Sequence, residues 1–540
     1  MSVRTALRAL LIAALAAAAA CSTPPQQRDV SETHWLRVAD GAGAVPTLNP
    51  HLFNGTTVHL IAQLTMAYLF RYDAQGRPQP ELATELPTQK NHGISADGRT
   101  ITFHLRHGVR WSDGAPFTAD DVAFTTRVIL DPANHELTRE GWDLITGIDE
   151  PDKYTVVYHL KRPYALFEPL FFGAGAASPC ILPKHVLGKE PNINHVAYNT
   201  KPIGIGPFRV VRWRPDESVD LEANPYYWRG LPRLHRITFR FLPTREALLE
   251  AMQSGDVDLW PGIPPTYVAK VQAIRALRTI VRPADFWSAL FFNVTRGPIA
   301  DVRVRRAIRL AIDRPAIVAT TLGGNGILEE AVLSPTVPVV PRDIPMVRFD
   351  PARARGLLES AGWALGPDGV RVKDGRRLTL ALAIRAGPSL EPAAQLIKKN
   401  LSDVGIGVQI RRYSGARMFA SYGDHGVVMR GNWDMTMFAW DSDPNGSLEN
   451  VFACNRIPPA GQNITRFCDP ELDLKLWRFT MTYDEDGRRL LEKQIQREID
   501  AQVPVVTLFA WKQGYASSPQ LEHYRPGSMA PFGNIMKLDI

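Results

Sequence analysis

Two aspartates in the last quarter of the chain have the spacing of ligands in a metal-binding loop. Asp441 and Asp443 stand in Asp441-Ser-Asp-Pro-Asn-Gly446, which copies the first half of an EF-hand calcium loop. The twelfth position of such a loop needs a glutamate that binds the metal through both oxygens, and Phe452 occupies it here. The stretch is also rich in turn-forming residues, so a surface turn is the alternative interpretation. We predict no metal site.

The motifs of common hydrolases and nucleotide-binding enzymes are missing from the sequence. None of His-Glu-x-x-His, Gly-x-Ser-x-Gly or Gly-x-x-x-x-Gly-Lys-Ser/Thr occurs, and these patterns carry zinc, an activated serine or a phosphate-binding loop. The 13 histidines are scattered and lack the spacing of zinc ligands. We therefore predict neither an enzyme nor a cofactor, and a hydrolase assembled by the fold alone has no positive support.

The first residues have the pattern of an export signal. Arg4 and Arg8 precede an unbroken apolar run from Ala9 to Ala20, which is too short to span a hydrocarbon core of roughly 30 Å as a helix. Small residues lead directly into Cys21, and this resembles a bacterial lipobox. We predict a signal peptide over 1–20, a lipidated Cys21 that anchors the chain to a membrane, and a flexible tether over 21–33. The alternative is an ordinary signal that is cleaved nearby.

Composition excludes some classes of partner. The formal net charge is +7 over 540 residues, and the basic residues are interspersed with acids, so we predict no nucleic-acid binding. No later segment has the apolar length of a membrane span. A chain of this length exceeds what one core holds, and two or three domains are expected.

The cysteines indicate one disulfide bond. With Cys21 lipidated, Cys180, Cys454 and Cys468 remain in an oxidising compartment. Cys454 and Cys468 flank a loop rich in proline, glycine and asparagine, and a bond between them is the preferred pairing. Closing a loop of about 15 residues could contribute roughly 3 kcal/mol. Cys180 would then be a free, buried thiol.

Short strand patterns alternate with amphipathic helices, which predicts a mixed α/β architecture. Residues 99–106 and 154–160 alternate apolar and polar side chains with the period of a half-buried strand. Residues 301–311 and 350–361 have helical apolar stripes, and we expect the arginines of the first helix to face mostly solvent. A helix around 491–499 is followed by a strand at 503–509, where a proline predicts an edge position or a strand start.

Four clusters of motifs follow one another along the chain. They run over 80–122, 203–258, 292–314 and 433–443, and include Gly108-Val-Arg-Trp111, Asn224-Pro-Tyr-Tyr-Trp228, Val302-Arg-Val-Arg-Arg-Ala-Ile308 and Trp433-Asp-Met-Thr-Met-Phe-Ala-Trp440. In order and spacing this chain resembles the extracellular solute-binding proteins, family 5, which serve dipeptide and oligopeptide ABC importers. The resemblance extends over nearly all of the chain beyond the tether.

The resemblance implies a three-lobed flytrap with a discontinuous first lobe. Lobe I would comprise 34–75, 201–285 and 505–540, lobe II 76–200, and lobe III 286–504. A strand at 503–509 that returns to an earlier sheet fits this arrangement.

The resemblance also implies a binding site. In this family a Trp-x-x-Asp stretch at a strand end supplies a carboxylate for the ligand's amine, so Asp443 would bind the amine and Trp440 would form a pocket wall. Asp441 is a second acid that alternation could place on the same face. It would favour an amine-rich ligand or pair with an arginine. Asn293, at the lobe crossover, either contacts ligand or supports a strand end, and Tyr515 and Phe532 are expected to face the cleft.

The implied function is capture of short peptides by lobe closure and delivery to a membrane permease driven by ATPase subunits. The protein would be a monomer in the periplasm or on the outer face of a bacterial membrane. Alternative ligands within the family are nickel chelates, haem, opines, oligosaccharides and cell-wall peptides. A ligand-sensing lipoprotein without transport is the alternative of another class.

Overall fold

The computed structural model describes residues 34–540 except 42, 54, 74–76, 138, 140, 172–178, 443 and 444. The predicted signal peptide, the tether, the lipidated Cys21 and Asp443 therefore lie outside the described residues. Among the helices that are described, none combines the length and the apolarity needed to span a bilayer.

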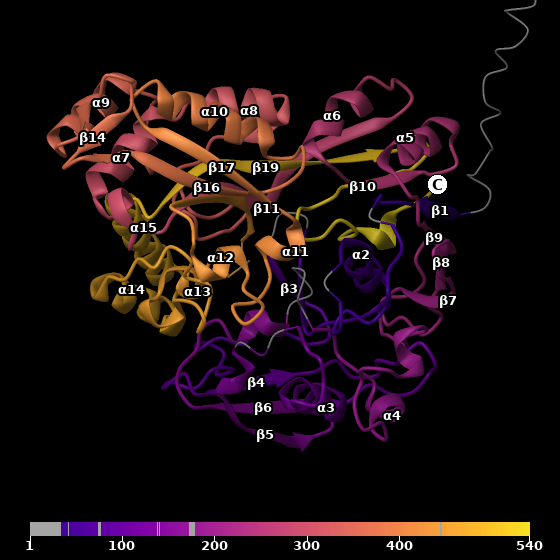
Figure 1. The fold of residues 1–540 in the computed structure, drawn as a ribbon. Coiled ribbons are helices and arrows are strands. Elements are labelled where there is room, and N and C mark those ends of the chain that lie inside the picture. The colour runs from indigo at the N-terminus through magenta and orange to yellow at the C-terminus, as the bar shows by residue number, and fades with distance from the viewer. Residues whose placement is uncertain are drawn as a thin grey trace, which may run out of the picture.

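One large mixed sheet joins residues from both ends of the described chain (Figure 1). Across the sheet the strands are β17 (Gly407–Tyr413), β16 (Thr379–Arg385), β18 (Met435–Asp441), β11 (Arg278–Phe292), β19 (Val505–Ser517), β10 (Leu259–Ile263), β1 (Trp35–Val38), β9 (Arg236–Arg240), β8 (Ser218–Ala223) and β7 (Phe208–Arg214). β1 is parallel to β9 and β10, and β16 is parallel to β17 and β18, whereas β11 and β19 are antiparallel to each other. The short β12 (Gly326–Ile327) also pairs with β19, outside this order.

Lobe I is built from three separate stretches of chain, as the sequence predicts. β1 comes from the start, β7 to β10 from the middle, and the second half of β19 from the end. The guanidinium of Arg37 donates to both carboxylate oxygens of Asp258 at 2.8 and 2.6 Å, and the Asp258 carbonyl accepts the Ser518 N–H at 2.7 Å. These contacts tie the three stretches together. Helix α2 (Thr56–Thr65) covers one face of this half-sheet, and α5 (Arg245–Ser254) and α6 (Pro265–Gln272) cover the other.

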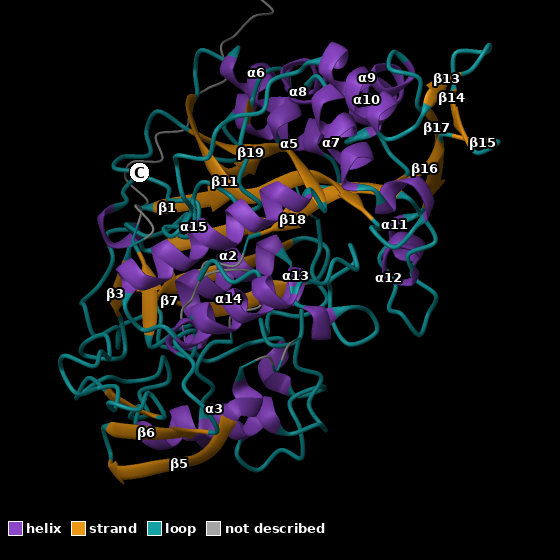
Figure 2. Ribbon diagram, turned by 90° about the vertical axis from the view of Figure 1, so that its left-hand side faces the viewer, coloured by secondary structure: helices purple, strands orange, loops and turns teal. Residues whose placement is uncertain are grey.

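Lobe III places helices on both faces of the other half of the sheet. α7 (Val302–Ala311), α8 (Arg314–Leu322), α9 (Pro351–Ser360) and α10 (Glu391–Ser402) share one apolar core with β16 and β18. α14 (Pro470–Met481) and α15 (Glu485–Gln502) lie on the opposite face (Figure 2). α7 and α9 are the helices predicted at 301–311 and 350–361, and the side chains of Asp301 and Asp350 cap their first turns.

Two of the four arginines of α7 are buried, so the expectation of a mostly solvated arginine face is wrong. Arg305 is 4% exposed and Arg309 is 8% exposed. Arg305 donates to the carbonyl of Gln502 at 2.6 Å, and Arg309 forms an ion pair with Asp500 at 2.5 Å. These guanidiniums satisfy groups at the C-terminal end of α15, where helix carbonyls lack intrahelical partners.

Lobe II is a separate three-stranded sheet packed against helices. β4 (Thr100–His104) and β6 (Thr155–Leu160) are the two predicted strands, they pair antiparallel, and β5 (Ile145–Asp152) completes the sheet. A capping box between Thr118 and Asp121 begins α3 (Ala119–Leu130), and α4 (Lys184–Leu187) packs against it. The small β2 (Phe70–Tyr72) and β3 (Pro78–Pro80) hairpin lies between lobes I and II in Figure 1.

The last long strand, β19, is an interior strand of the large sheet. It begins at Val505, directly after Pro504, and lies between β11 and β10. The proline predicted either a strand start or an edge strand. The strand start is correct and the edge position is wrong. A proline just before the first residue of a strand removes no hydrogen bond from the ladder. The predicted helix around 491–499 is part of α15.

The cysteines form the disulfide bond that their spacing predicted. A disulfide joins Cys454 to Cys468 with their Cα atoms 4.7 Å apart, and Cys180 is a buried free thiol. The bond closes the loop between α13 (Glu449–Phe452) and α14, at the side of lobe III.

Candidate ligand-binding site

Two strands pass from lobe I into lobe III, and their pairing is interrupted where they cross. Residues 278–283 of β11 pair with 512–517 of β19 in lobe I, and 287–291 pair with 505–510 in lobe III. The register shifts between Pro283 and Trp287 and again between Ser288 and Ala289. Such irregularities bend a strand locally. The two lobes are therefore joined by a pair of bent, continuous strands, and the predicted boundary between residues 285 and 286 falls within the first bend.

A cleft of about 390 Å³ opens beside this bend, between lobes I and III. Sites for small ligands commonly have volumes of roughly 300–1,000 Å³. Lobe I contributes the residues after β1, the first turns of α2 and α5, and the Pro261–Pro265 stretch, while lobe III contributes Ala439 of β18. Phe286 and Trp511 lie where the strands cross from one lobe to the other, and both line the cleft.

The crossing residues give the cleft an apolar wall. Phe286 is 44% exposed although it is a large hydrophobic residue. Trp511 is half-buried, and its indole N–H donates to the Ser288 hydroxyl at 2.8 Å, which fixes the ring against β11. Exposed aromatic surface inside a cleft is typical of ligand sites.

Charged groups of both signs line the lobe I side of the cleft. The Asp40 carboxylate accepts a hydrogen bond from the Thr57 hydroxyl at 2.5 Å. The Arg245 guanidinium lies 5.9 Å from the ring centroid of Tyr267. Within the described residues, the ammonium of Lys512 forms no ion pair or hydrogen bond. The cleft can therefore offer ionic contacts as well as apolar ones.

β18 carries two of the residues predicted for the site. Trp440 is half-buried and packs against Phe438 and Phe291, with ring centroids 5.6 and 5.8 Å away. Because successive strand residues face opposite sides, Trp440 lies on the face of β18 opposite to the cleft-lining Ala439. Asp441 is exposed on the Ala439 face and is paired in the ladder with Phe286.

The end of β18 is fixed to the bend in β11. The Ser442 N–H donates to the carbonyl of Asp285 at 2.9 Å, and the Ser442 hydroxyl accepts the Ser334 N–H at 2.7 Å. Asp443 follows directly in sequence, and its position lies outside the described residues. The predicted pair of acids thus begins next to the crossing, at the lobe III side of the cleft.

The other three predicted site residues are buried away from the cleft. Asn293 donates its amide to the carbonyl of Gly431 at 2.9 Å and accepts the Thr295 hydroxyl at 2.8 Å, so both ends of its side chain support the end of β11. Tyr515 is 1% exposed, and Phe532 is 3% exposed and packs against Phe239.

Sequence patterns did not point to the cations of the cleft. Arg245 and Lys512 are 267 positions apart (512 − 245) and belong to no motif, so only the tertiary fold places them on one wall. The one available signal was Pro261-Gly-Ile-Pro-Pro265, because such a stretch predicts irregular backbone. At the bend itself, burial raises the pKa of Asp285, and hydrogen bonds from Thr336 and Ser528 oppose that shift.

The described residues contain no group of three or more histidines, cysteines, aspartates or glutamates placed to hold a metal ion. A cleft lined from two lobes that share continuous strands is a common place for a ligand site. The family described as bacterial extracellular solute-binding proteins, family 5, matches residues 77–458. The chain belongs to this family, and it is a binding protein.

Known proteins align with nearly the whole chain. The di/tripeptide-binding protein 2 of Pseudomonas aeruginosa (strain UCBPP-PA14) is 28% identical over 518 residues, which cover 88% of this chain and 92% of that protein. The oligopeptide-binding protein AppA from Bacillus subtilis, solved with a nonapeptide, superposes with a TM-score of 0.74 at 24% identity and covers 94% of this chain and 98% of its own.

A solved protein with a different ligand has the same fold. NikZ from Campylobacter jejuni, solved with Ni(L-His), superposes with a TM-score of 0.76 at 21% identity, covering 94% of this chain and all of its own. At these identities the two structures establish the fold and leave the ligand open.

Proposed function

We propose that this chain is the substrate-binding component of a peptide-type ABC importer. The observation that carries the proposal is the cleft at the crossing of β11 and β19, which combines an exposed aromatic wall with ionic groups of both signs. A short peptide has matching chemistry, because it carries an ammonium, a carboxylate and apolar side chains, and burying these charges without partners costs several kcal/mol. The di/tripeptide-binding relative from Pseudomonas supports the same ligand class.

In this proposal the two lobes close over the peptide by bending at residues 283–289. Ligand shifts the population toward the closed form because only that form contacts it from both sides. Asp443 receives the ammonium on the lobe III side, and Asp441 adds negative charge beside it. Phe286 and Trp511 form the pocket wall in place of Trp440, which supports β18 from the opposite face through its aromatic cluster.

The cellular setting follows from the N-terminal pattern and the family. The chain is exported, Cys21 is lipidated, and the anchored monomer delivers its ligand to permease subunits that draw energy from cytoplasmic ATPases. Family 5 proteins are extracellular, which supports a periplasmic or outer-face location.

The cargo itself tests the ligand class. Protein purified gently from its host is denatured, and the released small molecules are identified by mass spectrometry. Recovery of di- to oligopeptides is the expected result. Recovery of a nickel chelate, haem or sugar in their place would contradict the peptide assignment, and peptide turnover by the purified protein would contradict a binding function.

The amine subsite is tested with Asp443→Ala. This variant should weaken a free-amine peptide by about 3–5 kcal/mol, the usual loss when one partner of a buried ion pair is removed, and should affect the N-acetylated peptide far less. Calorimetry of both peptides measures the difference. Asp403→Ala, on the outer end of α10, is the matched control. Equal losses for the two peptides would remove Asp443 from this role, and Asp441→Ala then shows whether its neighbour holds the amine.

A further inference from the structure

A buried histidine joins lobe I to lobe II. His51 lies in the stretch between β1 and α2 in lobe I, and Glu136 lies in the loop after α3 in lobe II. The side chain of His51 is 0% exposed and that of Glu136 is 3% exposed. Nδ1 of His51 lies 2.8 and 3.1 Å from the two carboxylate oxygens of Glu136. On the other side of the ring, Nε2 lies 2.8 Å from the backbone carbonyl oxygen of Cys180 in lobe II.

These two contacts require a particular protonation state of the ring. A backbone carbonyl oxygen can only accept a hydrogen bond, so Nε2 of His51 must carry a proton. An ionised carboxylate can also only accept, so Nδ1 must carry a proton as well. A neutral imidazole has a single N–H and could satisfy only one of the two acceptors. The geometry is therefore that of an imidazolium that donates to both lobe II groups.

The local electrostatics favour the same protonation state. Burial opposes the charged ring and would lower the pKa of His51, but the Glu136 carboxylate and the two hydrogen bonds outweigh burial and raise the pKa well above 6.5. His59, on α2, shows the opposite case. No carboxylate acts on its ring among the described residues, and burial lowers its pKa to about 4.

The other titratable and charged groups near the pair come from lobe II and from the end of α2. The Cys180 thiol acts on the ring of His51. Tyr68 and Tyr198 lie beside that thiol, and burial raises the pKa of both phenols well above 10. Arg139, on the loop of Glu136, donates to the backbone carbonyls of Ile129 and Asn134 at 2.7 and 2.6 Å. The phenols and the guanidinium therefore keep their charge state around neutral pH.

Neutral hydrogen bonds complete the contact between the two lobes. The Leu48 N–H donates to the backbone carbonyl of Asn199 at 2.8 Å, and the side-chain amide of Asn49 donates to the side-chain oxygen of Asn199 at 2.9 Å. These groups do not titrate. The charge-dependent part of the contact is therefore the pair formed by His51 and Glu136.

We propose that His51 and Glu136 form a buried, charged lock between lobes I and II that holds near neutral pH and weakens as the pH rises. When the pair loses a proton, the lone pair on Nδ1 faces a carboxylate that is buried from water, and both groups are left without a partner. The neutral bonds of Asn49 and Asn199 remain, so the contact loosens without coming apart. The lock involves no ligand, and it stands or falls separately from the proposed peptide binding.

The test compares the wild-type protein with Glu136→Gln, His51→Gln and the control Asp149→Asn. Glu136→Gln lets a neutral His51 keep both bonds, because the new amide can donate to Nδ1 while the Nε2–H donates to Cys180. Asp149 is a matched control because it pairs with His159 at the same distance of 2.8 Å, but their side chains are 68% and 41% exposed. Nitrogen-15 NMR of labelled histidine reports the state of each ring, and His51→Gln identifies the His51 signals. Denaturant unfolding measures stability against pH.

At pH 7.5 His51 should be an imidazolium in the wild type and in Asp149→Asn, whereas an unperturbed histidine is only about one tenth charged there. It should be neutral in Glu136→Gln. The stabilising contribution of the charged ring is fully present below pH 6.5 and is lost as the pH rises through the higher pKa of the folded state. From pH 6.5 to 8.5 the unfolding constant of the wild type should therefore rise about 10- to 100-fold more than that of Glu136→Gln. Groups that titrate elsewhere act alike in both proteins, so this difference isolates the pair.

Two results would overturn the lock. A neutral His51 in the wild type at pH 7.5 would show that Glu136 does not hold a charge on the ring. Parallel unfolding profiles of the wild type and Glu136→Gln from pH 6.5 to 8.5 would show that the pair does not couple pH to stability. If Glu136→Gln does not fold, the state of the His51 ring in the wild type decides. Failure of the protein to bind any peptide would overturn the proposed function and leave the lock standing.

Discussion

Lobe III meets lobe I and lobe II in two different ways. Toward lobe I the contact is backbone, because β11 and β19 continue from one lobe into the other and keep most of their ladder. Toward lobe II no strand ladder joins the two lobes among the described residues, and the contact is a surface. The first contact can bend but cannot separate, whereas the second can open without breaking a strand.

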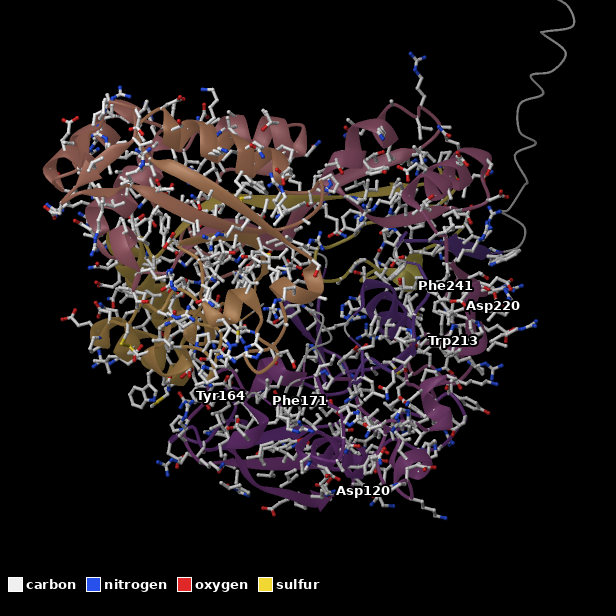
Figure 3. All side chains as sticks on the ribbon, viewed as in Figure 1. Asp120, Tyr164, Phe171, Trp213, Asp220 and Phe241 are labelled. Carbon is white, nitrogen blue, oxygen red and sulfur yellow. A yellow bond between two sulfur atoms is a disulfide. The ribbon has the colours of Figure 1, made fainter. Side chains whose placement is uncertain are left out.

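The contact with lobe II is built from a few hydrogen bonds on an apolar surface. The Tyr483 hydroxyl donates to the carbonyl of Gly98 at 2.8 Å and accepts the Tyr164 N–H at 3.2 Å. The Ala165 N–H donates to the carbonyl of Thr480 at 2.7 Å. Figure 3 shows Tyr164 and Phe171 at the edge of lobe II that faces lobe III. Apolar residues of the two lobes pack as one cluster around these bonds.

The packing at Gly98 is close. Its φ is +67°, and a Cβ there would lie 2.6 Å from the ring of Tyr483. A side chain at this position would therefore hold the two lobes apart. The difference between the two contacts indicates that the strands provide the hinge and that the Tyr483 surface sets how readily the lobes close.

Trp287→Ala should have the largest effect, on the hinge side. Trp287 is 1% exposed at the bend and pairs with Trp440 and Ala510 on the neighbouring strands. Removing a buried aromatic side chain costs about 3–5 kcal/mol of unfolding free energy. Because the strands connect both lobes, denaturant unfolding should shift to lower denaturant as a whole.

Phe286→Ala is the control for this prediction. Phe286 directly precedes Trp287 in the same bend but is 44% exposed, so its loss should change stability by less than about 1 kcal/mol. If Trp287→Ala lowers only one of two separate transitions, the lobes are not coupled through these strands.

Glu492 should make the lobe II side of lobe III sensitive to pH. It lies on α15 one turn after Arg488, which donates to the carbonyl of Ala165 in lobe II at 3.4 Å. Burial raises the pKa of Glu492 from 4.5 to about 8, and a hydrogen bond from Gln496 lowers it by less. Between these values the folded state keeps a proton that the unfolded state has lost. The stabilising contribution of Glu492 should therefore be fully present below pH 4.5 and be lost as the pH rises through about 8.

Glu492→Gln removes this titration. The loss of unfolding free energy between pH 5.5 and 8.5 should exceed about 1 kcal/mol in the wild type and be reduced in the variant. Glu471→Gln, at a side chain that is 85% exposed, should behave as the wild type. Identical pH profiles for all three proteins would show that Glu492 is ionised in the folded state.

The sequence predicted the elements better than the contacts between them. Local periodicity was enough for β4, β6, α7 and α9, because each pattern lies within one segment. It did not indicate that Arg305 and Arg309 would be buried, since their partners lie at the end of α15, more than 190 residues later. The period of two along β18 likewise leaves open which face meets the cleft, and the fold puts Ala439 there and Trp440 opposite.

Tyr483→Phe should have the smallest effect of these substitutions. It distinguishes the contact between lobes II and III from the hinge formed by β11 and β19. The variant keeps the ring against Gly98 and removes only the hydroxyl, which is worth about 0.5–1.5 kcal/mol. If the surface forms on closure, the ligand-free protein is mostly open, so its unfolding temperature should not change. Ligand affinity should fall about 2- to 10-fold, because the binding-competent fraction is smaller. A lower unfolding temperature without ligand, together with unchanged affinity, would show that lobes II and III stay packed, and only the bend at 283–289 would then move.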